Sequence, residues 1–168
     1  MPIARDQKTF DQYHFARGAF GEVALYANAM ERLEFWQPNF YEPPADILTR
    51  HAMRRAFMSA ILVAYSRPFG KSDAGWLPLS VDLLQYDADE LAAHNLFREI
   101  RHLSIAHAAG SVHRLRVYFT ETGIQTTADH PPRELTREGV DCISALARKA
   151  EQVLSLEIVR LAKRIRGT

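Results

Sequence analysis

The chain has 168 residues, enough for one hydrophobic core and too few for two ordinary domains, so we expect a single domain over residues 1–168. Hydrophobic residues make up 47% and charged residues 24%, a balance that excludes an intrinsically disordered protein. The net charge of only +1 excludes a generally basic nucleic-acid-binding protein, so a polyanion site must come from local clusters of Arg and Lys.

The cysteine content and the length of the apolar runs exclude further classes of protein. The single cysteine, Cys142, excludes an internal disulfide and a cysteine-rich zinc site, and it favours a cytoplasmic, reducing location. The longest apolar run, residues 60–65, is too short to cross a bilayer, so we expect no contact with membranes. The chain has no glycine-rich phosphate loop, and we expect neither a cofactor nor a metal ion.

Two long helices are predicted in the first half of the chain. Apolar residues recur at spacings of three and four over residues 10–36, which predicts an amphipathic helix. Three prolines within residues 37–44 interrupt this pattern. A second helix is expected over residues 44–66, and its second half is apolar on every side, as in a helix surrounded by others. Pro68 ends it, because the residue before a proline disfavours the helical conformation.

A third helix is predicted after a connector over residues 69–86 that includes one short helical turn near residues 79–84. Asp87 is expected to cap this helix, with Glu90 completing a capping box. Successive offsets of three and four predict a core-facing stripe of Ala92, Leu96, Ile100, Leu103 and His107. A second face consists of His94, Arg98, Arg101 and Ile105, and we expect a dimer partner to cover it.

The last third of the chain predicts a hairpin and one more helix. Apolar and polar residues alternate over residues 111–128 around a turn at Thr122 and Gly123, which is typical of two paired strands. Residues 136–166 carry the longest apolar stripe, and the basic residues of their final turn complement the helix dipole. We therefore predict an all-α four-helix bundle with a small β-hairpin insertion between the third and last long helices.

The stretch LFREIRHLSIAHAAG, residues 96–110, sets two arginines and two histidines in an apolar helical run. Together with residues 87–93, it resembles the HEPN superfamily of small helical domains, whose motif is an arginine, a polar residue and a later histidine, R-x(4–6)-H. Here the motif consists of Arg101, His102 and His107, with five residues between the arginine and the last histidine. Residues 65–69 also resemble a Tyr-x-Arg-Pro-Phe segment of some HEPN-like proteins.

The resemblance implies a metal-independent endoribonuclease whose two protomers line one composite cleft with Arg101 and His107. Arginine offers a planar donor fork for the scissile phosphate, and histidine transfers protons near neutral pH. The nucleophile would be the 2′-hydroxyl of RNA. His102, Arg98 and His94 are expected to support this site. Members of the superfamily often act in phage defence or as toxins that an antitoxin-like protein partner restrains.

Two other interpretations stay open. His102 stands where the family usually has asparagine or another small polar residue, which equally fits a non-catalytic HEPN-like domain that binds RNA, a nucleotide or a protein. A histidine at position 107 on an apolar stripe also fits a core histidine whose nitrogens are hydrogen bonded. In that case Arg98 and Arg101 would form ion pairs without chemistry, in a purely structural module.

Overall fold

The computed structural model describes residues 2–37, 44–71, 75–102, 115–120, 123–128 and 135–167. Within these ranges, the helices and strands in chain order are α1 (Pro2–Arg32), α2 (Pro44–Ser66), η1 (Arg67–Phe69), η2 (Val81–Leu84), α3 (Ala88–Arg101), β1 (Leu115–Thr120), β2 (Gly123–Ala128) and α4 (Arg137–Arg166). The elements η1 and η2 are short 3-10 helices, and β1 pairs antiparallel with β2. The predominantly helical class predicted from the sequence is confirmed.

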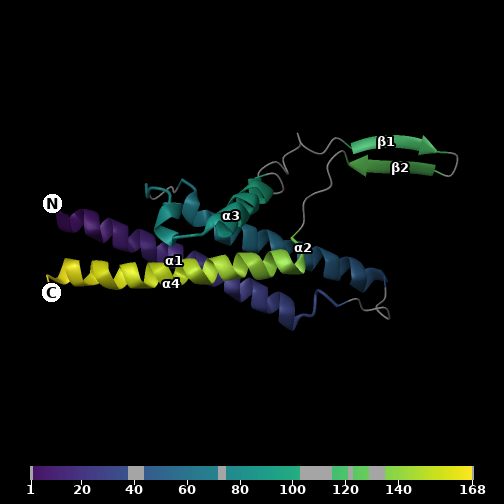
Figure 1. The fold of residues 1–168 in the computed structure, drawn as a ribbon. Helices are drawn as coiled ribbons and strands as arrows, with labels where there is room; N and C mark the ends of the chain where they lie inside the picture. The colour runs from purple at the N-terminus through teal and green to yellow at the C-terminus, as the bar shows by residue number, and fades with distance from the viewer. Residues whose placement is uncertain are drawn as a thin grey trace.

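Helices α1 and α4 lie side by side and antiparallel, and the start of α1 and the end of α4 lie at the same end of this pair (Figure 1). The stripe predicted for the last helix is buried as expected, at Ile143, Ala147, Ala150, Leu154, Ile158 and Leu161. In α2 the second half is also buried, at Met58, Ile61, Leu62, Ala64 and Tyr65. None of the helices within the described ranges combines the length and the apolar character that a bilayer crossing requires.

Helix α1 extends further toward the N-terminus than the apolar pattern predicted. It begins at Pro2 rather than near residue 10, and its first turns are largely polar. Local side-chain bonds stabilise these turns: Gln7 Nε2 donates to Asp11 Oδ1 at 2.9 Å, and Thr9 Oγ1 donates to the Arg5 carbonyl at 3.0 Å. A polar helical turn gives no periodic signal, and so the sequence pattern missed it.

The buried face of α3 differs from the predicted stripe, and this is a correction. Ile100 is buried as predicted, but His94 and Phe97 share its buried face, whereas Leu96 is 43% exposed. The observed face lies about 100° around the helix from the predicted one. Consequently His94 belongs to the core rather than to a face that awaits a dimer partner. Of the remaining residues assigned to the two predicted faces, 103, 105 and 107 lie outside the described ranges.

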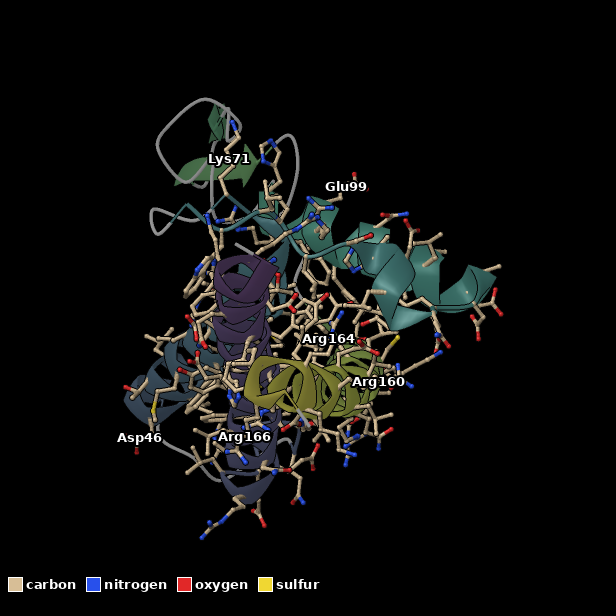
Figure 2. All side chains as sticks on the ribbon, turned by 90° about the vertical axis from the view of Figure 1, so that its left-hand side faces the viewer. Asp46, Lys71, Glu99, Arg160, Arg164 and Arg166 are labelled. Atoms are coloured by element: carbon tan, nitrogen blue, oxygen red, sulfur yellow. The ribbon has the colours of Figure 1, made fainter. Side chains whose placement is uncertain are left out.

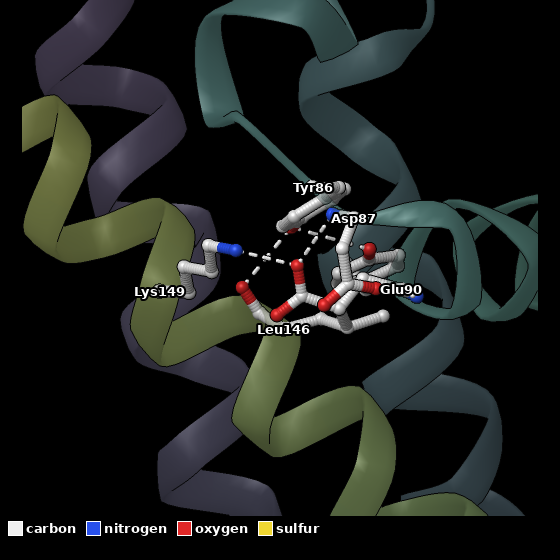
Figure 3. Close-up of polar contacts among 6 residues, drawn as sticks. Tyr86, Asp87, Glu90, Leu146 and Lys149 are labelled. Carbon is white, nitrogen blue, oxygen red and sulfur yellow. Dashed lines mark hydrogen bonds and ion pairs between the residues drawn. The ribbon is translucent and has the colours of Figure 1, made fainter.

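Hydrogen bonds and an ion pair, together called the polar joint, connect the start of α3 to α4. They include the predicted capping box, which is confirmed. Asp87 Oδ1 accepts from the Glu90 N–H, and Glu90 Oε2 accepts from the Asp87 N–H, each at 2.9 Å. Lys149 Nζ on α4 donates to the same Glu90 Oε2 at 2.5 Å (Figure 3). The hydroxyl of Tyr86 donates to the Leu146 carbonyl at 3.0 Å. This joint therefore sets where α3 begins relative to α4.

We expect Asp87→Ala to lower the free energy of unfolding by about 1 kcal/mol, because the mutation removes the side-chain acceptor of the helix cap. Asp89→Ala is the matched control, since it removes an exposed carboxylate of the same first turn without a cap hydrogen bond. Urea denaturation of both variants measures the difference. Equal destabilisation by the two mutations would contradict a specific role for the cap.

Candidate functional site

A pocket of about 500 Å³ lies where the end of α2 and η1 meet the C-terminal end of α3. It brings together residues 66–71 and 98–102, which belong to the two stretches predicted to resemble HEPN proteins, although about thirty residues separate them along the chain. The residues that line it are Ser66, Arg67, Phe69, Gly70, Lys71, Arg98, Glu99, Arg101 and His102. The pocket is thus formed by both walls of a junction between two helices.

The lining of the pocket is cationic, although the chain as a whole is nearly neutral. Its four Arg and Lys side chains face one carboxylate of the lining, Glu99. A second carboxylate, Glu22 on α1, accepts from Arg67 Nη1 at 3.2 Å. Among the described residues, these four cations and two carboxylates leave an excess of two positive charges. A local cluster of this kind is what a polyanion site in a neutral protein requires.

Figure 2 shows that Lys71 and Glu99 lie on the α3 side of the molecule. The basic residues of the last turns of α4, among them Arg160, Arg164 and Arg166, surround the end of that helix instead. They complement its dipole, as the sequence indicated. The two groups of basic residues are therefore separate surfaces.

Arg101 is half-buried in the pocket wall, and its Nε atom has no hydrogen-bond partner within the described part of the chain. The buried Ser66 hydroxyl on the opposite wall also has no hydrogen-bond partner among the described residues. A buried donor without an acceptor destabilises the folded state by about 1–3 kcal/mol. Such atoms are uncommon in native structures and often mark a site for a ligand or a water molecule.

Phe69 forms the floor between the pocket and the core. The guanidinium carbon of Arg98 lies 6.0 Å from the centroid of its ring, at the limit of a cation–π contact. On the core side the ring meets the His94 imidazole edge-on, with centroids 4.5 Å apart. Phe69 is only 6% exposed, and so it separates a charged surface from an aromatic interior.

His94 lies behind this floor, in a chain of hydrogen bonds. Its Nδ1 is 3.0 Å from the Tyr65 hydroxyl, which donates to the Tyr86 hydroxyl at 3.4 Å. The only hydroxyl proton of Tyr86 goes to the Leu146 carbonyl, so we assign the His94 proton to Nδ1, where it is donated to Tyr65. Burial and, to a smaller extent, the charge of Arg98 lower the pKa of His94 to about 4.

Tyr65 and Tyr86, the two tyrosines in this chain of hydrogen bonds, are also neutral at pH 7. Burial raises the pKa of Tyr86 to about 12 and raises that of Tyr65 further. At pH 7 the interior behind the pocket therefore carries no charge from His94, Tyr65 or Tyr86. His94 supports the pocket floor from the core side and is not one of the residues that line the pocket.

The structure brings together three of the five residues singled out from the sequence. Arg98, Arg101 and His102 line one pocket, whereas His94 stands behind it. His107 lies outside the described residues. The sequence pattern did not assign Ser66, Arg67 or Lys71 to a site. The only signal was the resemblance of residues 65–69, because two cations after a helix end show nothing by themselves about their partners.

Comparison of the chain with protein-family models, with curated proteins and with solved structures finds no match. In the described part of the chain, no three His, Cys, Asp or Glu side chains come together as ligands of a metal ion would. The chemistry of the pocket is therefore the structural basis for a function, and the HEPN resemblance of the two stretches stays a prediction.

Proposed function

We propose that this protein is a metal-independent endoribonuclease of the HEPN type, a cytoplasmic homodimer that acts in phage defence or as a toxin under the control of an antitoxin-like partner. In this proposal the four helices form the HEPN bundle and the hairpin is its insertion. The observation that carries the proposal is the cationic pocket, where Arg101 of the motif lies with Arg98 and His102. An arginine cluster in a cavity suits a phosphate and the charge that develops on it during transfer.

The chemistry proposed is an internal transfer at phosphorus. The 2′-hydroxyl loses its proton to a base and attacks the adjacent phosphate, while the bond to the 5′-oxygen breaks and that oxygen takes up a proton. Arg101 stabilises the charge on the phosphate oxygens, and His107 transfers protons. The products are a 2′,3′-cyclic phosphate and a 5′-hydroxyl. His102, which shares the pocket with Arg101, takes the place of the small polar residue that the family usually has.

The proposal is tested by incubating the purified protein with RNA in excess chelator. We expect the wild type to cleave and Arg101→Ala and His107→Ala each to lower the rate by about 100-fold or more, because each removes a group that acts on the reacting phosphate. Product ends are identified by mass spectrometry. Arg137→Ala is the control, since it removes an arginine that pairs with Glu31 at 3.1 Å and does not line the pocket.

Undiminished cleavage in both motif variants would contradict the assignment of the site. A second candidate function is a non-catalytic HEPN-like domain that uses the same pocket to bind RNA, a nucleotide or a protein. The presence of His102 in the pocket lining favours it, because the motif there departs from the family pattern. A folded wild type that binds RNA without cleaving it would support this second function.

A further inference from the structure

We infer that the pocket between η1 and α3 binds a terminal phosphate monoester, as found at the end of an RNA strand or on a free nucleotide, and that Arg67 and Lys71 are ligand-binding residues. The inference deepens the proposed function and rests on it, because Arg101 belongs to both. It names the group that the pocket selects and adds two residues from outside the motif helix.

The charge of the pocket favours a monoester over an internal phosphodiester. A monoester carries a charge of about −1.5 to −2 at pH 7 and presents three acceptor oxygens. A diester carries one negative charge. The excess of two positive charges that the described lining residues and Glu22 provide matches the monoester. Removing either Arg67 or Lys71 would leave an excess of one, which suits a diester as well.

The donors approach from two sides, as binding of a tetrahedral group requires. Arg98 and Arg101 are three residues apart on α3, and side chains at this spacing are neighbours on a helix surface. Arg67 and Lys71 come from the segment that follows α2 and form the opposite wall. Each arginine presents a planar fork of N–H donors, which fits phosphate oxygens in pairs.

The state of Arg101 also indicates an anionic ligand. Its buried Nε–H has no acceptor within the described residues, and a bound phosphate oxygen would allow the side chain to turn and pair this donor. Arg98 is already held against Phe69, and Arg67 is oriented by Glu22. Two of the four cations are thus positioned before a ligand arrives, which limits the entropy lost on binding.

The volume of the pocket allows more than a phosphate ion. About 500 Å³ lies within the range of small-molecule sites, which is about 300–1,000 Å³. The sugar of the terminal nucleotide therefore fits beside the phosphate. A free nucleotide and the end of an RNA strand share this chemistry, and the experiment separates them.

The test measures binding of 2′-O-methyl RNA decamers that carry a 5′-phosphate, a 3′-phosphate or neither, by fluorescence anisotropy. These strands lack the 2′-hydroxyl nucleophile, so the result is independent of whether the protein cleaves RNA. We expect one phosphorylated strand to bind about tenfold more tightly than the unphosphorylated one, the order that one or two additional charge-assisted hydrogen bonds provide. This advantage disappears in Arg67→Ala and in Lys71→Ala.

Three controls make the result specific. Arg137→Ala breaks an exposed Arg–Glu pair like that of Arg67 but keeps the advantage of the phosphate. Glu31→Gln breaks the same Arg137–Glu31 pair from its carboxylate side and also keeps the advantage. Circular dichroism shows that the variants fold, as expected because exposed ion pairs add only about 0–1 kcal/mol to stability.

Competition with adenosine 5′-monophosphate and with adenosine identifies the source of the phosphate. Displacement by the nucleotide but not by the nucleoside shows that a free nucleotide suffices, and no displacement by either, with the strand preference intact, assigns the site to RNA ends. Equal affinity of all three strands for the wild type would overturn the inference. That result would leave the ribonuclease proposal standing, since cleavage is measured separately.

Discussion

His94 is expected to contribute about 3 kcal/mol to the free energy of unfolding at pH 7, and lowering the pH to 4 should remove most of this contribution. Burial lowers the pKa of His94 to about 4 in the folded protein, whereas an exposed histidine titrates at 6.5. Between these values the unfolded chain binds a proton that the folded protein does not. The contribution is therefore complete above about pH 6.5, and it is lost progressively as the pH falls from there to the folded pKa near 4.

Urea denaturation of the wild type and of His94→Gln at several pH values between 7 and 4 measures this effect. Glutamine stays neutral throughout and still offers a polar atom to the Tyr65 hydroxyl, so the variant should lose much of the pH dependence while remaining folded. His51→Gln replaces an exposed histidine and is the matched control, which should keep the dependence of the wild type. The same slope in all three proteins would show that His94 titrates normally in the folded state.

Phe69→Ala is expected to lower the free energy of unfolding by about 3–5 kcal/mol, the range for removal of a buried aromatic side chain. The ring packs against Phe20, Tyr65 and His94, with centroids 5.9, 5.8 and 4.5 Å away. Its loss would open a cavity between the pocket and the core, and it would also remove the surface over which the Arg98 guanidinium lies.

Phe69→Leu separates the two roles of the ring, because leucine keeps part of the buried volume without a π face. We expect a smaller loss of stability than in the alanine variant, together with weaker binding of a phosphorylated strand. Leu77→Ala is the control for a large apolar residue outside the core, since Leu77 is 78% exposed, and it should change stability by less than about 0.5 kcal/mol. Thermal and chemical denaturation measure these differences, and a near-neutral Phe69→Ala would exclude a structural role for this floor.

The parts of the fold that short-range rules control could be predicted from the sequence. The bounds of α2 agree with the prediction, because Pro44 suits a first turn and Pro68 limits the end. Asp87 and Glu90 form the predicted capping box because both bonds arise within one turn. The buried stripe of α4 follows from its regular spacing over thirty residues, which leaves one choice of inward face.

The orientation of α3 could not be predicted in this way. Its fourteen residues place Ala92 and Leu96 on one side and Phe97 with His94 on another, and an apolar pattern alone favours the side without the imidazole. The structure buries the other side, because Tyr65 and Phe69 of the preceding segment provide a hydrogen bond and edge-on ring contacts for the imidazole. A buried histidine is acceptable only where another part of the chain supplies these partners.

The candidate site, like the fold, could be predicted from the sequence only in part. The sequence by itself determined which residue types were present: Arg101 and His102 in a helical motif, and a second stretch over residues 65–69 that resembles the same superfamily. Only the tertiary structure decided that Arg67 and Lys71 join Arg98 and Arg101 in one pocket and that His94 stands behind its floor. The physical reason is that spacing along a chain determines neighbours within one helix, whereas the meeting of two helices depends on which faces they bury.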